Sequence, residues 1–265
     1  MVVLMCCSTS LAAAPDQAAG RPAAATRTVD HSLFDGLLRR HVVGGLVDYA
    51  AFARAPELAR YLALLDAARP EALPRDEQLA YWINLYNAAT IHLINKHGEN
   101  ESIRNINKSF GVLKLSGPWS ERFVRAGGSV YTLDEVEHEI IRKRFGEPRI
   151  HFALVCAAVG CPPLRSEAYT GARLNEQLDD QARAFLLRSP EKNRVDLSRR
   201  TLYVSKIFGY YKEDFGGDHR AIGRYIARFH PEGPEKNLLL SGEFMLEETE
   251  YDWTLNGQEK APTRR

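Results

Sequence analysis

The spacing of apolar side chains along the chain predicts a series of amphipathic helices. Apolar residues recur at helical spacing from His31 to Val42, and again after Pro56, a residue suited to the first position of a helix. The longest periodic segment runs from Arg75 to His97, and Gly98 is placed to end it. Three further helices are expected over residues 135–145, 172–189 and 219–229.

Extended segments are fewer and shorter. Residues 123–133 alternate around two glycines, and residues 195–204 flank a polar turn, so both predict β-hairpins. Residues 150–157 are almost continuously apolar and rich in β-forming residues, which predicts a buried strand, with a buried helix as the alternative. Residues 99–122 and 243–255 lack a clear helical period. The expected fold is α+β: a helix-rich single domain with a small sheet of hairpins and one buried strand.

The two ends of the chain differ in composition from this periodic region. Residues 1–14 contain no charged side chain and finish on a Leu-Ala-Ala-Ala run, which resembles a secretory signal whose positively charged start is missing. We therefore expect a signal-like segment over 1–18, a flexible leader over 19–29, one domain over 30–257 and a tail over 258–265. The expected location is periplasmic or secreted, through an N-terminal signal that is truncated.

Composition narrows the class of protein. The 265 residues are 45% hydrophobic and carry a formal net charge of +1, which is typical of a soluble globular chain with a sizeable core. A nucleic-acid-binding protein usually shows a basic excess, and a membrane span needs about 18 consecutive apolar residues. Neither feature is present in the sequence. We expect an unknown small-molecule or peptide ligand, no nucleic acid and no membrane span.

The cysteines pose the main chemical question. Cys6 and Cys7 precede any signal cleavage, which leaves Cys156 and Cys161 in the mature chain. Three interpretations stay open: a Cys/His catalytic site, a structural disulfide, or two buried free thiols. On a regular strand His151 and Cys156 point to opposite faces, because they are five positions apart. His151 and Cys161 can meet if the loop after the strand folds back.

Known cofactor and metal motifs are missing from the sequence. The cysteines have C-x4-C spacing without a second cysteine pair, and His92 and His97 are five apart on a helix, so a zinc site is not expected. No glycine-rich phosphate loop and no G-x-S-x-G elbow occurs. Asp214-Phe215-Gly216 is interpreted as a turn. We expect no cofactor, and no metal is assigned.

Two further groups of polar residues have both a functional and a structural interpretation. Glu137 and His138 lie within a predicted helix, where they either face solvent or bring a carboxylate and an imidazole to a cleft. Asn84 and Asn87 lie near one another on the longest helix. Their amides either orient an imidazole and donate to an oxyanion, or satisfy buried backbone. The other histidines have no evident partner and are expected at the surface: His31, His41, His97, His219 and His230.

Several motifs occur in a characteristic order along the chain. They are Tyr81-Trp-Ile-Asn-Leu-Tyr-Asn-Ala88, Asp134-Glu-Val-Glu-His138, Arg149-Ile-His-Phe-Ala-Leu-Val-Cys156, Gly160-Cys-Pro-Pro-Leu164, Val204-Ser-Lys-Ile-Phe-Gly-Tyr-Tyr-Lys-Glu-Asp-Phe-Gly216 and Tyr251-Asp-Trp-Thr-Leu-Asn256. Together they strongly resemble the DUF547 family, a domain of unknown function found in bacteria and plants. The resemblance spans roughly residues 47–256. One departure is Ala158, where the family often has Ser.

This resemblance supplies no reaction, but it selects positions. Carried over residue by residue, the family pattern marks Asn84, Asn87, Glu137, His138, Arg149, His151, Cys156, Cys161 and Pro162. Polar residues in a fold are costly unless they are paired or used, so the resemblance favours a site.

The leading hypothesis is a thiol-dependent hydrolase or acyl/amide transferase. Cys161 is the nucleophile, and His151 or His138 is the base. Glu137 or Asn84 orients the base, and Asn87 donates to an oxyanion. Cys156 is grouped with the catalytic residues, and Arg149 with the binding residues Asn84 and Asn87. This hypothesis requires His138, His151, Glu137 and Cys161 to converge on one pocket.

Two alternatives belong to different functional classes. The first is a non-catalytic periplasmic binding or interaction module, in which Cys156 and Cys161 form a structural pair. The second is a redox role, in which the same pair cycles between disulfide and dithiol.

Overall fold

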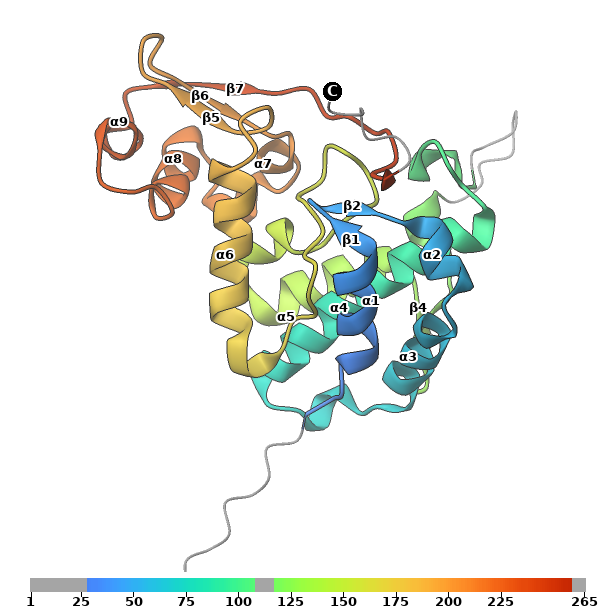
Figure 1. The fold of residues 1–265 in the computed structure, drawn as a ribbon. Coiled ribbons are helices and arrows are strands. Elements are labelled where there is room, and N and C mark those ends of the chain that lie inside the picture. Colours follow the sequence, from blue (N-terminus) through green and yellow to red (C-terminus); the bar gives the residue numbers. More distant parts are fainter. Residues whose placement is uncertain (1–27, 108–116, 259–265) are drawn as a thin grey trace, which may run out of the picture.

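The computed structural model describes residues 28–107 and 117–258. The signal-like segment over 1–18, most of the leader and nearly all of the tail lie outside these described residues. Within them the fold is a helix-rich α+β domain with small sheets of two or three strands, as the sequence predicts (Figure 1). In the described part of the chain, every helix is too short or too polar to cross a membrane.

The N-terminal part of the domain is built on the long helix α4 (Arg75–His97), which ends at Gly98 in the left-handed conformation. Nearly every side chain from Leu79 to Ile94 is buried, so this helix forms the centre of the larger hydrophobic cluster. Helices α2 and α3 both pack against α4, and α1 packs against α2 and α3. The bounds of the preceding elements are α1 (Ser32–His41), β1 (Val42–Val43), β2 (Leu46–Val47), α2 (Tyr49–Arg54), α3 (Pro56–Ala67) and η1 (Pro70–Ala72).

The middle of the chain contains the first predicted hairpin and a π-helix. Strands β3 (Val124–Ala126) and β4 (Ser129–Tyr131) pair antiparallel around the two glycines. The helix expected over 135–145 forms as a π-helical segment, η4 (Glu135–Arg142), continued by α5 (Lys143–Phe145). Short 3-10 turns complete this part: η2 (Ile103–Asn105), η3 (Pro118–Ser120) and η5 (Pro148–Phe152).

The C-terminal part has its own three-stranded sheet, in the order β5-β6-β7. The second predicted hairpin is present, and the last strand adds parallel to β6. Helix α9 lies where no helix was expected. The elements are η6 (Gly171–Arg173), α6 (Leu174–Leu187), β5 (Arg194–Asp196), β6 (Thr201–Val204), α7 (Ile207–Tyr210), η7 (Lys212–Phe215), α8 (His219–Ala227), α9 (Pro234–Ser241) and β7 (Met245–Glu248).

Two hydrophobic clusters form the core, and η5 connects them. The larger surrounds α4, whereas the smaller lies between α6, α8 and the three-stranded sheet. Ile150 belongs to the first cluster and Phe152 to the second. His151, between them, is therefore held at the junction of the two clusters.

The buried strand expected over 150–157 is not formed. Pro148 begins the 3-10 helix η5, whose start is capped by the Glu147 side chain, and the chain continues as irregular buried backbone. The Asn87 amide donates to Ala153 O and accepts from Val155 N–H, both at 3.0 Å. A side chain from α4 thus supplies hydrogen bonds that a neighbouring strand would otherwise provide.

His31 also differs from expectation, because it is buried rather than at the surface. It is 5% exposed, and its Nδ1 lies 2.6 Å from the Tyr61 hydroxyl. Burial lowers the pKa of His31 to about 4. The imidazole is therefore neutral near pH 7.

Candidate functional site

The π-helix η4 places two of the predicted residues at the site. Its start is stabilised by a reciprocal pair of bonds, in which Glu135 N–H donates to Thr132 Oγ1 and Thr132 N–H donates to Glu135 Oε2, both at 2.9 Å. π-Helical segments are rare and occur frequently at functional sites. Glu137, on this segment, is 7% exposed, and His138 follows it.

A histidine–aspartate–arginine network lies beside this helix. The Nε2–H group of His151 donates to Asp214 Oδ2 at 2.6 Å. Arg142 binds the same carboxylate with Nε and Nη2, at 2.7 and 2.9 Å, and its Nη1 donates to Nδ1 of His138 at 3.1 Å. His151 also stacks on the Tyr211 ring, with the ring centroids 3.9 Å apart. These contacts fix the tautomer of His151 and leave its Nδ1 as the basic atom.

Burial sets the protonation of this network. It is the largest influence on His151 and lowers its pKa, although the bond to Asp214 opposes the shift. For Asp214 burial alone would raise the pKa, but the hydrogen bonds from Arg142 and His151 outweigh it and lower the pKa. At neutral pH the site therefore holds a neutral imidazole against an ionised carboxylate, the state needed for a general base.

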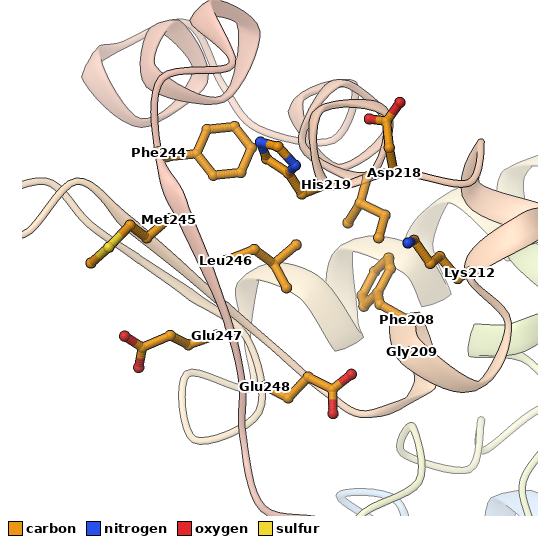
Figure 2. Close-up of a pocket in the computed structure, with 11 residues that line it drawn as sticks. Phe208, Gly209, Lys212, Asp218, His219, Phe244, Met245, Leu246, Glu247 and Glu248 are labelled. Atoms are coloured by element: carbon orange, nitrogen blue, oxygen red, sulfur yellow. The ribbon is translucent and has the colours of Figure 1, made fainter.

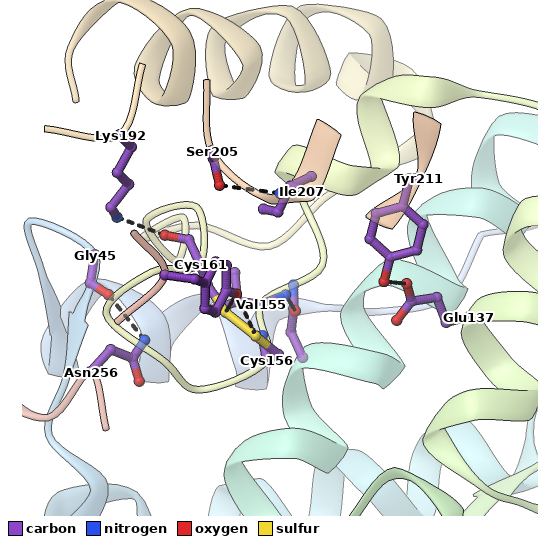
Figure 3. The surroundings of a disulfide bond; sticks show 12 residues. Gly45, Glu137, Val155, Cys156, Cys161, Lys192, Ser205, Ile207, Tyr211 and Asn256 are labelled. Carbon is purple, nitrogen blue, oxygen red and sulfur yellow. Dashed lines mark hydrogen bonds between the residues drawn. A yellow bond between two sulfur atoms is a disulfide. The ribbon is translucent and has the colours of Figure 1, made fainter. Parts of the chain in front are cut away.

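Glu137 is held by tyrosines rather than by a cation. The Tyr211 hydroxyl donates to Glu137 Oε1 at 2.5 Å (Figure 3). Burial, followed by the negative charge of Glu137, raises the pKa of Tyr86 and of Tyr211 far above the usual tyrosine value. Both hydroxyls thus keep their protons beside this carboxylate.

Cys156 and Cys161 form a disulfide, drawn in Figure 3, with Cα atoms 6.3 Å apart. The Tyr251 hydroxyl lies 3.1 Å from Cys156 Sγ and 3.2 Å from Cys161 Sγ, and it donates because neither sulfur carries a proton. The backbone N–H of Cys156 also donates to Cys161 Sγ at 3.1 Å. Two donors therefore face the sulfur of Cys161.

The C-terminal segment 251–256 holds the disulfide loop in place. Val159 N–H donates to Thr254 O and Gly160 N–H donates to Asp252 O, both at 2.8 Å. A Cβ on Gly160 would lie 2.9 Å from the Tyr251 ring and 3.0 Å from the Asp252 backbone, so only glycine fits here. The position of the loop thus rests on backbone pairing as well as on the disulfide.

One cavity of about 210 Å³ is lined by Glu137, the two histidines His138 and His151, and the disulfide. It lies against the disulfide, and aromatic rings form much of its wall. Its lining residues are Tyr86, Trp119, Asp134, Glu137, His138, His151, Leu154, Cys156, Cys161, Pro162, Ile207, Tyr210, Tyr211, Tyr251 and Trp253. All five residues assigned to catalysis from the sequence are in this lining.

The three residues assigned to binding lie elsewhere. Asn84 donates to Tyr169 O at 2.8 Å and accepts from Tyr169 N–H at 2.9 Å, and Asn87 makes the equivalent pair of bonds beside the disulfide loop. Both amides thus satisfy buried backbone, which is the structural interpretation of these residues. Arg149 forms ion pairs with Glu147 and Asp179.

Sequence reasoning missed Asp214, Tyr211, Arg142 and Tyr251 as site residues. The sequence predicts a turn at Asp214, and this residue does lie in the 3-10 turn η7. The signal was present, because Tyr211, Asp214 and Tyr251 belong to the motifs that carry the family resemblance. The partners of Tyr211, Asp214 and Tyr251 come from distant parts of the chain. Only the fold therefore shows that these motifs meet at one site.

A larger groove of about 630 Å³ lies between α8 and β7, apart from this site (Figure 2). It contains side chains of both charges, among them Lys212, Asp218 and Glu248, and none of the residues predicted for the site. Within the described ranges, no group of three or more His, Cys, Asp or Glu side chains is arranged to hold a metal ion.

Comparison with known families gives a match over part of the chain. The model of the family described as "Protein of unknown function, DUF547" matches residues 70–186. Residues 70–186 belong to the DUF547 family. No curated protein and no solved structure matches the chain. The matched region contains Glu137, His138, His151 and the disulfide. Tyr211 and Tyr251, which also line the cavity, and Asp214, which binds His151, follow it in the chain.

Proposed function

We propose that this protein is a cysteine-dependent hydrolase or acyl/amide transferase, with the 210 Å³ cavity as its active site and the disulfide as a latent form. The observation that carries the proposal is that Cys161 and His151 line the same cavity, while Nε2 of His151 is bound to Asp214. A thiol, an imidazole and a carboxylate that orients the imidazole are the parts of a nucleophilic site.

The surroundings of Cys161 suit a thiolate once the disulfide is opened. The Cys156 N–H and the Tyr251 hydroxyl both donate toward its sulfur, and such donors stabilise negative charge. A small dithiol or thioredoxin-like donor would supply the two electrons: its two thiols become a disulfide, and Cys156 and Cys161 become thiols. Backbone pairing with segment 251–256 would keep the loop in place after reduction.

The reaction then follows the usual covalent course. His151 accepts the thiol proton, and the Cys161 thiolate forms a bond to the carbonyl carbon of an ester or amide. The leaving alcohol or amine takes the proton from the imidazolium, and a thioester remains. Water, or a second nucleophile, breaks the thioester and restores the thiol.

We also propose that the protein works outside the cytoplasm. The signal-like first residues and the disulfide support this proposal. An oxidising compartment would keep Cys156 and Cys161 in a disulfide until a reductant reduces it.

The test is site-resolved alkylation of Cys161 in the full chain, after reduction, across pH 5–10. We expect reaction well below the ordinary thiol pKa of about 8.5. His151→Asn should move the midpoint upward by about one unit or more, because the imidazole that accepts the thiol proton is lost. His219→Asn is the matched control, since His219 lines the separate groove.

Two results would contradict the proposal. A Cys161 midpoint at about 8.5 in the reduced, folded protein shows an unactivated thiol. An unchanged midpoint in His151→Asn shows that the imidazole does not act on the sulfur.

A second candidate is favoured by the disulfide itself. If the pair never opens, the cavity serves as a binding pocket in a non-catalytic module, with Cys156–Cys161 as a structural clamp. A disulfide that resists thioredoxin-like donors in the folded protein would favour this function over the first.

A further inference from the structure

The ligand class can be read from the charges and rings that line the cavity. Asp134 and Glu137 supply two carboxylates, and of the described residues in the lining none is Lys or Arg. Asp134 accepts from Ser120 Oγ at 3.0 Å, and Glu137 accepts from Tyr211. In the described part of the chain, neither carboxylate has a Lys, Arg or His nitrogen within 4.0 Å.

A buried carboxylate without a cation is costly, so its presence requires an explanation. Glu137 is 7% exposed, whereas the nearby Arg142 is bound by Asp214 in two hydrogen bonds. The other ion pairs on the same helical segment are complete: Arg122 pairs with Glu135, and Lys143 pairs with Glu139. Glu137 is therefore the carboxylate of this segment that lines a cavity without a direct ion pair, although Arg142 and His151 are close enough to interact with its charge.

Aromatic rings surround the space that this carboxylate faces. Tyr210 and Tyr251 have ring centroids 6.0 Å apart, Tyr251 and Trp253 4.6 Å, and Trp253 and Trp119 6.0 Å. Tyr210 is 56% exposed, which is unusual for a large ring and places it at the rim. The faces of Trp and Tyr attract cations, and Arg104 already lies over Trp253, at 5.1 Å from the ring centroid.

We infer that the cavity binds an organic cation, an ammonium or guanidinium group, between Glu137 and the rings of Trp119, Tyr210 and Tyr251. The cavity volume of about 210 Å³ lies below the 300–1,000 Å³ of drug-sized sites, so it suits one cationic head group rather than a whole large ligand. This inference rests on the cavity being the active site, as proposed above. It adds that the substrate carries a cationic group. It does not depend on the chemistry of Cys161.

The test uses the full oxidised chain, in which no Cys161 thiolate exists. The indole N–H signals of Trp119 and Trp253 are followed by NMR, and Trp119→Phe and Trp253→Phe assign them. The probes are tetramethylammonium chloride, sodium chloride at equal concentration, and tert-butanol as the neutral molecule of similar shape. We expect saturable shifts with tetramethylammonium alone.

Two variants decide the role of Glu137. Glu137→Gln keeps an acceptor for the Tyr211 hydroxyl but removes the charge, and it should weaken the binding of tetramethylammonium at least tenfold. Glu139→Gln is the matched control, because Glu139 is exposed on the same helical segment and should leave binding unchanged.

Three results would overturn the inference. The first is equal binding of tert-butanol and tetramethylammonium, the second is unchanged binding in folded Glu137→Gln, and the third is the absence of a saturable shift with tetramethylammonium. Because the disulfide is closed throughout, these results are independent of whether reduced Cys161 is reactive.

Discussion

His151 and Asp214 are 63 positions apart in the chain, yet Nε2 of the histidine lies 2.6 Å from a carboxylate oxygen of the aspartate. Burial lowers the pKa of His151, while the hydrogen bond to Asp214 acts in the opposite direction. The aspartate therefore does two things: it selects the tautomer with the proton on Nε2, and it limits how far burial depresses the pKa.

Replacing this aspartate should change the titration of the histidine. In Asp214→Asn the charge that supports the imidazolium is lost, so the pKa of His151 should fall further below its usual value. Loss of the carboxylate also leaves Arg142 without its partner, and unfolding free energy should fall by about 1–3 kcal/mol. NMR titration and urea unfolding measure the two effects. A rise in the His151 pKa would contradict the assigned role.

His31 gives a pH dependence of stability away from the site. Burial lowers its pKa to about 4 in the folded protein, against about 6.5 when unfolded, so between these values only the unfolded state binds the proton. The stability linked to a neutral His31 is fully present above about pH 6.5 and is lost as the pH falls toward 4. The free energy of unfolding should fall by about 3 kcal/mol over this range. Urea unfolding from pH 7 to pH 4 should show a shallower pH slope in His31→Asn. A pH slope equal to that of the wild type would exclude His31 as the cause. His41→Asn is the control for the effect of replacing a histidine by asparagine.

The longer helices were predictable because their signals are local. The apolar period of Arg75–His97 and the glycine after it define α4 without reference to the rest of the chain. The segment 150–157 was not predictable in the same way. Its apolar run indicates burial, but not whether the backbone forms a strand. The hydrogen bonds that hold it as irregular backbone come from Asn87, 66 and 68 positions earlier in the chain than Ala153 and Val155.

The candidate site was predictable only in part, for a related reason. Cys156, Cys161, His151, His138 and Glu137 were selected because their chemistry is conspicuous or because the family resemblance marks them. Asp214 belongs to one of the family motifs, but its role is not visible there, because an Asp-Phe-Gly turn has the same sequence whether or not a histidine is bound to it. Asn84 and Asn87 show the converse: amides suited to catalysis serve the backbone instead.

Asn87 should matter for stability and for the shape of the disulfide loop. Asn87→Ala removes the donor to Ala153 O and the acceptor for Val155 N–H, and each buried group left without a partner costs about 1–3 kcal/mol. We expect a loss of about 3 kcal/mol in unfolding free energy, together with faster reduction of the disulfide. Asn84→Ala removes an equivalent pair of bonds at Tyr169, away from the disulfide, so it should lower stability without changing the reduction rate. Equal reduction rates in the two variants would contradict this account.

Gly160 tests whether segment 251–256 positions the site. In Gly160→Ala the new methyl group would lie 2.9 Å from the Tyr251 ring and 3.0 Å from the Asp252 backbone, so the segment must shift away from the loop. We expect about 1–3 kcal/mol of destabilisation from this overpacking. The Tyr251 hydroxyl should also leave the sulfurs of Cys156 and Cys161, and the disulfide should then be more readily reduced. Gly117→Ala is the control, because a Cβ there meets no atom of the described residues within 4 Å. If Gly160→Ala matches the control in both urea unfolding and reduction rate, the loop is held by the disulfide alone, and backbone pairing could not preserve the Cys161 environment after reduction.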